Sequence, residues 1–245
     1  MTLRLSKSIR RFVLRASAVI ALAATSWAVA AQEVIKQTST TVFPIKITMP
    51  GSYRLASDLT VASPTADAID ITVDNVTLDL NGFSIIGPGV ESATGSIGIN
   101  GSRASGVTVT NGTVTAMARA GVFLGLNAHV EGVRALANGP NAIANIRVGA
   151  YSRVIGNVTE FSFEGIHCDV GCLVSGNTVN LNVSGIVGGP GTLVFGNSVS
   201  SNFDVGIELF EQTGYGKNVM ENDTACLGTF GGTSMGDNVC NGVLQ

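Results

Sequence analysis

Long helices are not expected in this chain, because the residues that build and solvate them are scarce. Charged residues make up 13% of its 245 residues, against about 25% in typical soluble domains. The chain also contains 31 glycines, which weaken helix interiors. A collagen-like chain is excluded, because only six prolines occur and glycine follows no three-residue period. A disordered chain is excluded as well, since 45% of the residues are hydrophobic and can form a core.

Tryptophan is almost absent, and the single Trp27 lies in a segment that resembles an export signal. Residues 1–15 hold five basic residues and no acid, and an apolar run follows them. Small residues around Ala30 then offer a cleavage site. This order predicts a signal peptide over residues 1–31, with an uncleaved N-terminal anchor as the alternative. The pair Arg10-Arg11 loosely resembles a twin-arginine signal, so the choice between the Sec and twin-arginine routes stays open.

Basic residues are scarce once the signal peptide is removed. All 17 acids lie at or after Glu33, whereas five of the 14 basic residues leave with the signal, so nine bases face 17 acids and the net charge becomes −8. Nucleic-acid binding is not expected, because the remaining chain has no basic stripe. No second apolar stretch is long enough to span a membrane. We therefore expect a soluble, monomeric protein that is periplasmic or secreted.

Four cysteines remain, and in an oxidising compartment they can pair. Cys168 and Cys172 bracket a short Asp-Val-Gly turn, and Cys226 and Cys240 bracket a glycine-rich loop. We favour these two pairs over the other two pairings because each closes a small loop, and four free thiols are a further alternative. A metal bound through these cysteines is not expected, because no two of them have the two-residue spacing of zinc sites.

A repeat runs through the second half of the chain. Gly-Asn dipeptides end at Asn157, Asn177 and Asn197, which are 20 residues apart, and we assign Asn222 to the same series 25 residues further on. Asparagine tolerates left-handed backbone at a turn, and stacked amides can hydrogen-bond to one another. The series therefore predicts a structural asparagine ladder, and an asparagine-rich binding face is the alternative.

A second series of apolar residues keeps the same step and predicts a column in the core. Its members are Val122, Ile143, Ile166, Ile186 and Ile207. A unit this short cannot bury its own apolar side, so successive units must stack and pair in parallel, about 4.8 Å apart. The sequence therefore predicts an all-β parallel solenoid with about seven coils between residues 75 and 225.

The chain resembles secreted bacterial parallel β-helix proteins of the pectin-lyase-like superfamily. The segments that carry the resemblance are Met49–Leu55, Asp58–Val61, Ala68–Ile71, Asp74–Gly82 and the later Gly-Asn-x-Val repeats. The resemblance implies a right-handed parallel β-helix over residues 61–225, with an N-terminal cap over 32–60 and a C-terminal loop cap over 226–245. It implies no single activity, because the superfamily includes lyases, hydrolases, esterases, epimerases and members with no known reaction.

The resemblance also implies that a substrate lies along one outer sheet. Candidates follow the apolar column by one position, and they are Asn100, Phe123, Ala144, His167, Val187 and Glu208. His167 could act as a catalytic acid or base. Arg147, one coil earlier, could hold a uronate carboxylate, and Glu208, about 10 Å from His167 by strand spacing, could be a partner or binding group. The alternative for all three is an ordinary solvated side chain.

Several features of active enzymes in this superfamily are missing. The sequence has neither the adjacent Asp-Asp with a downstream Gly-His-Gly of polygalacturonases nor the Asp-Pro-His-Glu of alginate epimerases. No cofactor is expected, although calcium could bind the acidic stretch that contains Asp67, Asp70, Asp74 and Asp79. An aromatic platform for sugar stacking is not expected either, because the chain after the signal has three tyrosines and no tryptophan.

Two functional hypotheses follow. In the first, the protein engages polysaccharide or envelope glycan along an outer sheet as a lyase-like or hydrolase-like enzyme, with His167 as acid or base, Arg147 as substrate clamp and Glu208 as partner. In the second, it is a non-catalytic extracellular binding or surface-scaffold module. The missing signatures favour the second hypothesis, and the resemblance favours the first.

Overall fold

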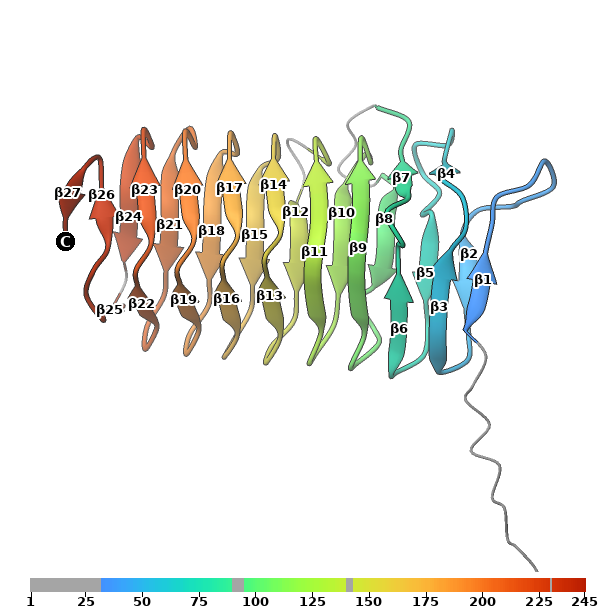
Figure 1. Ribbon diagram of the computed structural model, residues 1–245, viewed down its shortest axis with the longest axis horizontal. Helices are drawn as coiled ribbons and strands as arrows, with labels where there is room; N and C mark the ends of the chain where they lie inside the picture. Colours follow the sequence, from blue (N-terminus) through green and yellow to red (C-terminus); the bar gives the residue numbers. More distant parts are fainter. Residues whose placement is uncertain (1–31, 90–94, 140–142, 230) are drawn as a thin grey trace, which may run out of the picture. The chain divides into compact units, whose positions relative to one another are not determined.

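The computed structural model describes residues 32–89, 95–139, 143–229 and 231–245. The predicted signal peptide over 1–31 lies outside the described residues. The described part of the chain contains strands and no helix, as its many Val, Ile and Thr residues favour. The strands wind into stacked coils that pair in parallel along the molecule (Figure 1). The predicted all-β parallel β-helix is confirmed.

One side of the solenoid is a nine-stranded sheet to which each coil contributes one strand. Its strands are β2 (Ile45–Ile47), β5 (Ile69–Ile71), β8 (Ile97–Gly101), β10 (Ala120–Leu124), β12 (Ala144–Val148), β15 (Glu164–Cys168), β18 (Ser184–Gly188), β21 (Val205–Leu209) and β24 (Ala225–Thr229). The solenoid therefore has about nine coils, and the predicted number of about seven was too low. The difference lies at the start, since β2 already pairs with β5 before residue 75.

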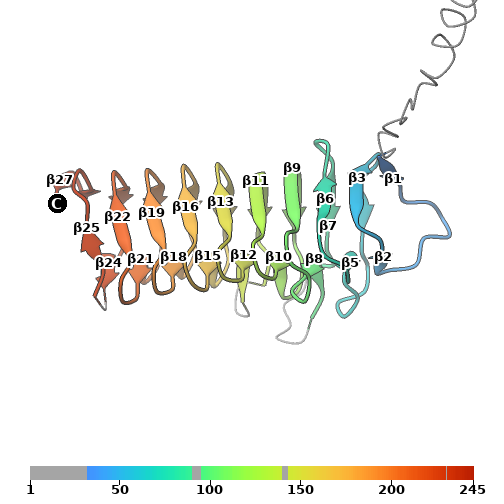
Figure 2. The ribbon, with the colours of Figure 1, turned by 90° about the horizontal axis from the view of Figure 1, so that it is seen from below.

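The other side is an 18-stranded sheet, to which most coils contribute two short strands. Its strands are β1 (Glu33–Ile35), β3 (Gly51–Leu55), β4 (Leu59–Thr60), β6 (Val76–Asp79), β7 (Ser84–Ile86), β9 (Thr108–Thr115), β11 (His129–Leu136), β13 (Arg153–Ile155), β14 (Val158–Glu160), β16 (Leu173–Ser175), β17 (Thr178–Asn180), β19 (Leu193–Phe195), β20 (Ser198–Ser200), β22 (Gly214–Gly216), β23 (Val219–Glu221), β25 (Thr233–Ser234), β26 (Val239–Cys240) and β27 (Val243–Leu244). Figure 2 shows the two sheets as separate layers along the whole solenoid. In Figure 1 the larger sheet runs upward in front and the smaller one downward behind as the chain advances to the left, which is a right-handed winding.

The core between the sheets consists of apolar columns, as the repeat predicts. One column holds Ile99, Val122, Ile146, Ile166, Ile186 and Ile207, which lie in adjacent register and are fully buried. The prediction was wrong at one member, because Ile146, and not Ile143, pairs with Val122 and Ile166. The coil from Val122 to Ile146 takes 24 residues, so a step of about 20 residues lands on the wrong isoleucine.

The two ends of the solenoid are built from the coil strands themselves. Residues 32–60, expected as a cap over the first coil, supply β1, which pairs in line with β3. At the other end β27 runs antiparallel to β26, and the Cys226–Cys240 disulfide joins β24 to β26. Cys168 and Cys172 form the second disulfide, so both favoured pairings are confirmed. Two disulfides fit a protein outside the cytoplasm.

A ladder of buried asparagines runs along the kink between the paired strands of the larger sheet. The Oδ1 atom of Asn177 accepts hydrogen bonds from the backbone N–H and Nδ2 of Asn157, at 2.9 and 3.0 Å. The backbone N–H and Nδ2 of Asn177 donate in turn to Oδ1 of Asn197, both at 2.9 Å. These three asparagines stack along the solenoid as the spacing predicts.

The fourth predicted member, Asn222, does not belong to the ladder. Asn218 takes that place, because its Oδ1 accepts both the backbone N–H and Nδ2 of Asn197 at 3.0 Å. Asn222 is exposed at a different turn. The residue before each ladder asparagine adopts the left-handed backbone, with φ of 65° at Gly176 and 55° at Lys217. Since Lys217 replaces the usual glycine, the Gly-Asn signature is lost at Asn218.

A second buried ladder lies at the turn that leads into the nine-stranded sheet, and the sequence analysis missed it. The backbone N–H of Asn182 donates to Oδ1 of Asn202 at 3.1 Å. The backbone N–H and Nδ2 of Asn202 donate to Oδ1 of Asp223 at 2.7 and 2.8 Å. Asp223 is buried, and its Oδ2 atom has no hydrogen-bond partner. Burial raises the pKa of Asp223, and the hydrogen bonds from Asn202 oppose this shift.

Candidate functional site

The outer face of the nine-stranded sheet carries one continuous line of side chains, which we call the outward row. Its members are Lys46, Asp70, Asn100, Phe123, Arg147, His167, Val187, Glu208 and Gly228, each in register with the next. The sequence analysis predicted most of these positions. It placed Ala144 where Arg147 lies, because the longer coil before β12 shifts the phase. Ala144 is buried and pairs with Glu164.

His167 lies at the centre of a cluster of charged groups on the outward row. Its Nδ1 atom is 2.9 Å from Oε2 of Glu164, and its Nε2 atom is 3.3 Å from Oδ1 of Asp169. The same oxygen of Asp169 lies 3.5 Å from the guanidinium of Arg147. Arg147 also stacks over the ring of Phe123, 5.5 Å from the ring centre. The structure therefore brings two predicted site residues, Arg147 and His167, together through Asp169.

Glu208, the third predicted site residue, is not part of this cluster. It pairs with Val187, which in turn pairs with His167, so two strand spacings, or about 10 Å, separate the two side chains. The carboxylates that contact His167 are those of Glu164 and Asp169. Strand alternation gives no signal for Glu164, because residues three apart point to opposite faces of a regular strand. Only the structure shows its contact with His167.

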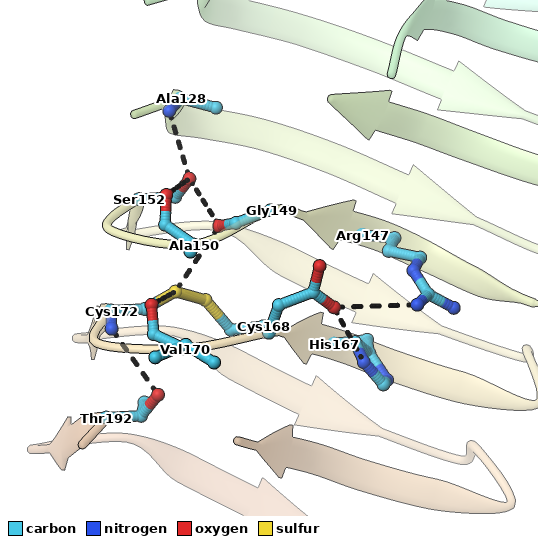
Figure 3. The surroundings of a disulfide bond; sticks show 11 residues. Ala128, Arg147, Gly149, Ala150, Ser152, His167, Cys168, Val170, Cys172 and Thr192 are labelled. Atoms are coloured by element: carbon cyan, nitrogen blue, oxygen red, sulfur yellow. Dashed lines mark hydrogen bonds and ion pairs between the residues drawn. A yellow bond between two sulfur atoms is a disulfide. The ribbon is translucent and has the colours of Figure 1, made fainter. Parts of the chain in front are cut away.

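The Cys168–Cys172 disulfide closes the turn that presents Asp169 to the cluster (Figure 3). The backbone N–H of Cys172 donates to the hydroxyl of Thr192 in the next coil at 3.4 Å. In the preceding coil, the Ser152 hydroxyl donates to the Gly149 carbonyl at 2.7 Å. The Ser152 hydroxyl also accepts the backbone N–H of Ala128 from the coil before at 2.9 Å, so hydroxyl groups join successive turns while the disulfide closes one of them. The Asp169 carboxylate keeps a defined position because the turn on which it lies is covalently closed.

Exposed aromatic side chains lie at the ends of the strands around the His167 cluster. Phe163 directly precedes β15 and is 42% exposed, and Tyr151 follows β12 and is 65% exposed. Phe203 precedes β21 and is 64% exposed. The low tyrosine and tryptophan content argued against an aromatic platform, but phenylalanines supply exposed rings in the turns that lead into this sheet. Periodicity alone did not mark them, because these residues lie in turns and not on the outward row.

A cleft of about 530 Å³ lies further along the same face, towards the N-terminus. Its lining includes Asp70, Asn100, Arg103, Arg119 and Phe123. It lies on β5, β8 and β10, where the connections between coils are longest. The sequence analysis assigned no role to the two arginines, since neither belongs to the outward row.

Three of the four aspartates considered for calcium, Asp67, Asp74 and Asp79, have other partners. Asp67 accepts hydrogen bonds from the backbone of Ile97 and from Nδ2 of Asn100, at 2.7 and 2.8 Å. Asp74 accepts one from the backbone of Ser105 at 2.8 Å. Within the described ranges, no group of three or more His, Cys, Asp or Glu side chains is arranged to hold a metal ion. These carboxylates therefore join one coil to the next.

Comparison with family models, curated proteins and solved structures finds no match to this chain. Over the part that the structure describes, none of the elements is a helix that could cross a membrane. The geometry of the described residues is therefore the basis for assigning a function.

Proposed function

We propose that this is an exported β-helix protein that binds polysaccharide or envelope glycan along the outer face of its nine-stranded sheet. The observation that carries the proposal is the combination of the His167 cluster with exposed rings at the strand ends. Rings such as Phe163 and Tyr151 can stack on the apolar faces of sugars. Arg147 can donate two parallel hydrogen bonds to a carboxylate. The signal-like N-terminus and the two disulfides support a periplasmic or secreted location.

Membership of the pectin-lyase-like superfamily is part of this proposal. The N-terminal segments of the sequence support it, and so does the parallel winding of the coils. The proposed protein acts as a monomer and binds no nucleic acid, because the chain after the signal is strongly acidic.

Binding accounts for the geometry better than catalysis does. Both ring nitrogens of His167 already face carboxylates, at 2.9 and 3.3 Å, so neither is free to take a proton from a substrate without rearrangement. The predicted partner Glu208 is too far away to share a proton with His167. We therefore place the non-catalytic binding module first. A lyase-like or hydrolase-like enzyme, with His167 as acid or base and Arg147 as clamp, is the second candidate because the site joins these two residues.

A glycan panel tests the proposal. The purified protein is screened for binding to neutral and acidic polysaccharides, and each mixture is followed for unsaturated-uronate absorbance and new reducing ends. We expect binding without turnover, and Arg147→Ala should weaken it about tenfold. The matched control is Arg153→Ala, which removes an exposed arginine from the opposite sheet and should leave binding unchanged.

Three outcomes would each overturn part of this assignment. Equal binding by wild type and Arg147→Ala would remove the outward row from the site. Product formation that disappears in His167→Ala would replace the binding module with the enzyme. Absence of binding to every glycan would reject the proposed ligand class.

A further inference from the structure

We infer that the 530 Å³ cleft on β5, β8 and β10 is a separate anion site, in which Arg119 and Arg103 bind a carboxylate, sulfate or phosphate group. The inference concerns residues outside the His167 cluster and does not depend on glycan binding there. It rests on two guanidinium groups, those of Arg119 and Arg103, that have no carboxylate partner. It also rests on the hydrogen bonds within the chain that already occupy Asn100, which lines the same cleft.

Arg119 carries an unmet hydrogen-bonding requirement. Its Nε atom is buried and has no hydrogen-bond partner. Buried N–H donors in native proteins almost always have a partner, and an unpaired one is destabilising. Its backbone N–H donates to the carbonyl of Ser96 at 2.9 Å, which fixes the start of β10 and directs the side chain from a rigid position. Arg119 also lines the cleft, so an oxyanion that binds there can pair with its guanidinium group and reaches Nε only when the side chain shifts.

Arg103 adds a second cation to the same cleft. Among the ion pairs of the described residues, none involves Arg103 or Arg119. By contrast, Arg147 further along the face is paired with Asp169. Both arginines line the cleft without a carboxylate partner, so an oxyanion bound there can neutralise their charge and accept their planar N–H groups.

Asn100 and Ser102, which also line the cleft, are engaged within the chain. Nδ2 of Asn100 donates to Asp67 at 2.8 Å, and Oδ1 of Asn100 accepts from the hydroxyl of Ser102 at 2.9 Å. Among the described residues of the lining, Asp70 is the one carboxylate and faces two arginines, so these residues carry a net positive charge. Asp70 can accept a hydroxyl of a larger ligand, and the ring of Phe123 bounds the cleft towards Arg147. The chemistry therefore fits an oxyanion attached to a hydroxylated compound.

Titration calorimetry with small anions tests this site directly. The purified protein is titrated with inorganic phosphate and inorganic sulfate, and then with glucuronate, glucose 6-sulfate, glucose 6-phosphate and neutral glucose. We expect at least one inorganic oxyanion to bind, its sugar derivative to bind more tightly, and glucose not to bind. Increasing salt should weaken each interaction, because the contact is between charges. The three sugar derivatives distinguish carboxylate, sulfate and phosphate as the preferred group.

Variants identify the residues responsible. Arg119→Gln should weaken binding at least tenfold, and Arg119→Lys, which keeps the charge but loses the fork of N–H groups, should also bind more weakly than wild type. Arg103→Gln changes an exposed residue, so it reports on the site even if the Arg119 variants unfold. Arg153→Gln on the opposite sheet is the control and should bind as wild type does.

Failure of this inference can be told apart from failure of the proposed function. If no oxyanion binds, or if Arg119→Gln and Arg103→Gln bind as tightly as wild type, the anion site does not exist. Oxyanion binding that depends on these arginines, in a protein that binds no polysaccharide, would support the site and reject the glycan proposal. Polysaccharide binding that depends on Arg147, in a protein that binds no small oxyanion, would support the glycan proposal and reject the anion site.

Discussion

The two halves of the solenoid differ in the regularity of their coils. From Ile146 through Ile166, Ile186 and Ile207 to Leu227, paired core residues are 20, 20, 21 and 20 positions apart. From Ile69 through Ile99 and Val122 to Ile146, the steps are 30, 23 and 24. The regular half contains both asparagine ladders over most of their length, whereas the irregular half contains the cleft.

This difference shows what coil length controls. Equal coils return each asparagine to the same angular position, so one amide can donate to the next along the axis. Longer connections break that alignment, but they leave the sheet pairing intact because the extra residues lie in the turns. The turns of the irregular half can then enclose a cleft. The regular half therefore carries the asparagine ladders and the His167 cluster, whereas the irregular half carries the cleft.

The largest effect is expected from a charge placed in the shared core column. Ile166→Asp in the regular half and Ile99→Asp in the irregular half each put a carboxylate at a fully buried position. Each should lower the free energy of unfolding by more than about 4 kcal/mol, because the charge has no partner there. Denaturant unfolding measures both. A variant that unfolds like wild type would show that its half does not share the core.

A smaller effect is expected from a break in the first asparagine ladder. Asn177→Ala removes the acceptor for the Asn157 backbone N–H and the donor to the Val154 carbonyl, both buried. The cost should be about 3 kcal/mol, because buried groups lose their partners. Asn222→Ala is the control. It lies outside the ladder with φ of 59°, so it should cost about 1 kcal/mol through backbone strain alone. Equal costs would mean that the ladder does not stabilise the regular half.

A substitution at Asp223, the end of the second ladder, should raise the free energy of unfolding, whereas the substitutions above lower it. Burial raises the pKa of Asp223 in the folded state above its unfolded value. Its contribution to stability is therefore present at acidic pH and is lost as the pH rises through the folded pKa. Asp223→Asn should stabilise the protein at neutral pH by about 1 kcal/mol, since an amide removes the buried charge and keeps the acceptor for Asn202.

Unfolding measured against pH distinguishes this explanation from a general surface effect. The gain from Asp223→Asn should shrink as the pH falls, because the wild-type carboxyl group then becomes neutral. A gain that stays constant over acidic and neutral pH would contradict the assignment of a buried, charged Asp223.

The smallest change in stability is expected at the His167 cluster. His167→Ala should change the free energy of unfolding by less than about 1 kcal/mol, because partly exposed ion pairs contribute little. Thermal and denaturant unfolding would both detect a larger loss. Such a loss would mean that the cluster supports the fold, and it would weaken the case for a binding surface.

Much of the fold could be predicted because the evidence for it is periodic. The columns through Ile166 and Ile186 and the ladder through Asn157, Asn177 and Asn197 repeat at nearly constant spacing. Predictions were wrong where the spacing changed, at Ile143 and Asn222. There an insertion in one coil, or a lysine in place of a glycine, hid the structural equivalent from a search by spacing.

Less of the candidate site could be predicted, because its residues come from turns as well as strands. Arg147 and His167 were found by register. The contact of Asp169 with both of them depends on a disulfide-closed turn that spacing does not describe. Arg103 follows β8 and Arg119 precedes β10, so spacing along the sequence does not indicate that both side chains line one cleft.

The sequence by itself determined that short apolar strands must stack into a parallel solenoid, because no single repeat can bury its own hydrophobic side. Its cysteine spacing also favoured the two disulfides that form. Only the tertiary structure decided how many coils stack, which asparagine continues the ladder and which charged groups meet on the outer face. Those outcomes depend on how far each turn advances the chain around the core, and a turn's path is determined by its contacts with the coils above and below it.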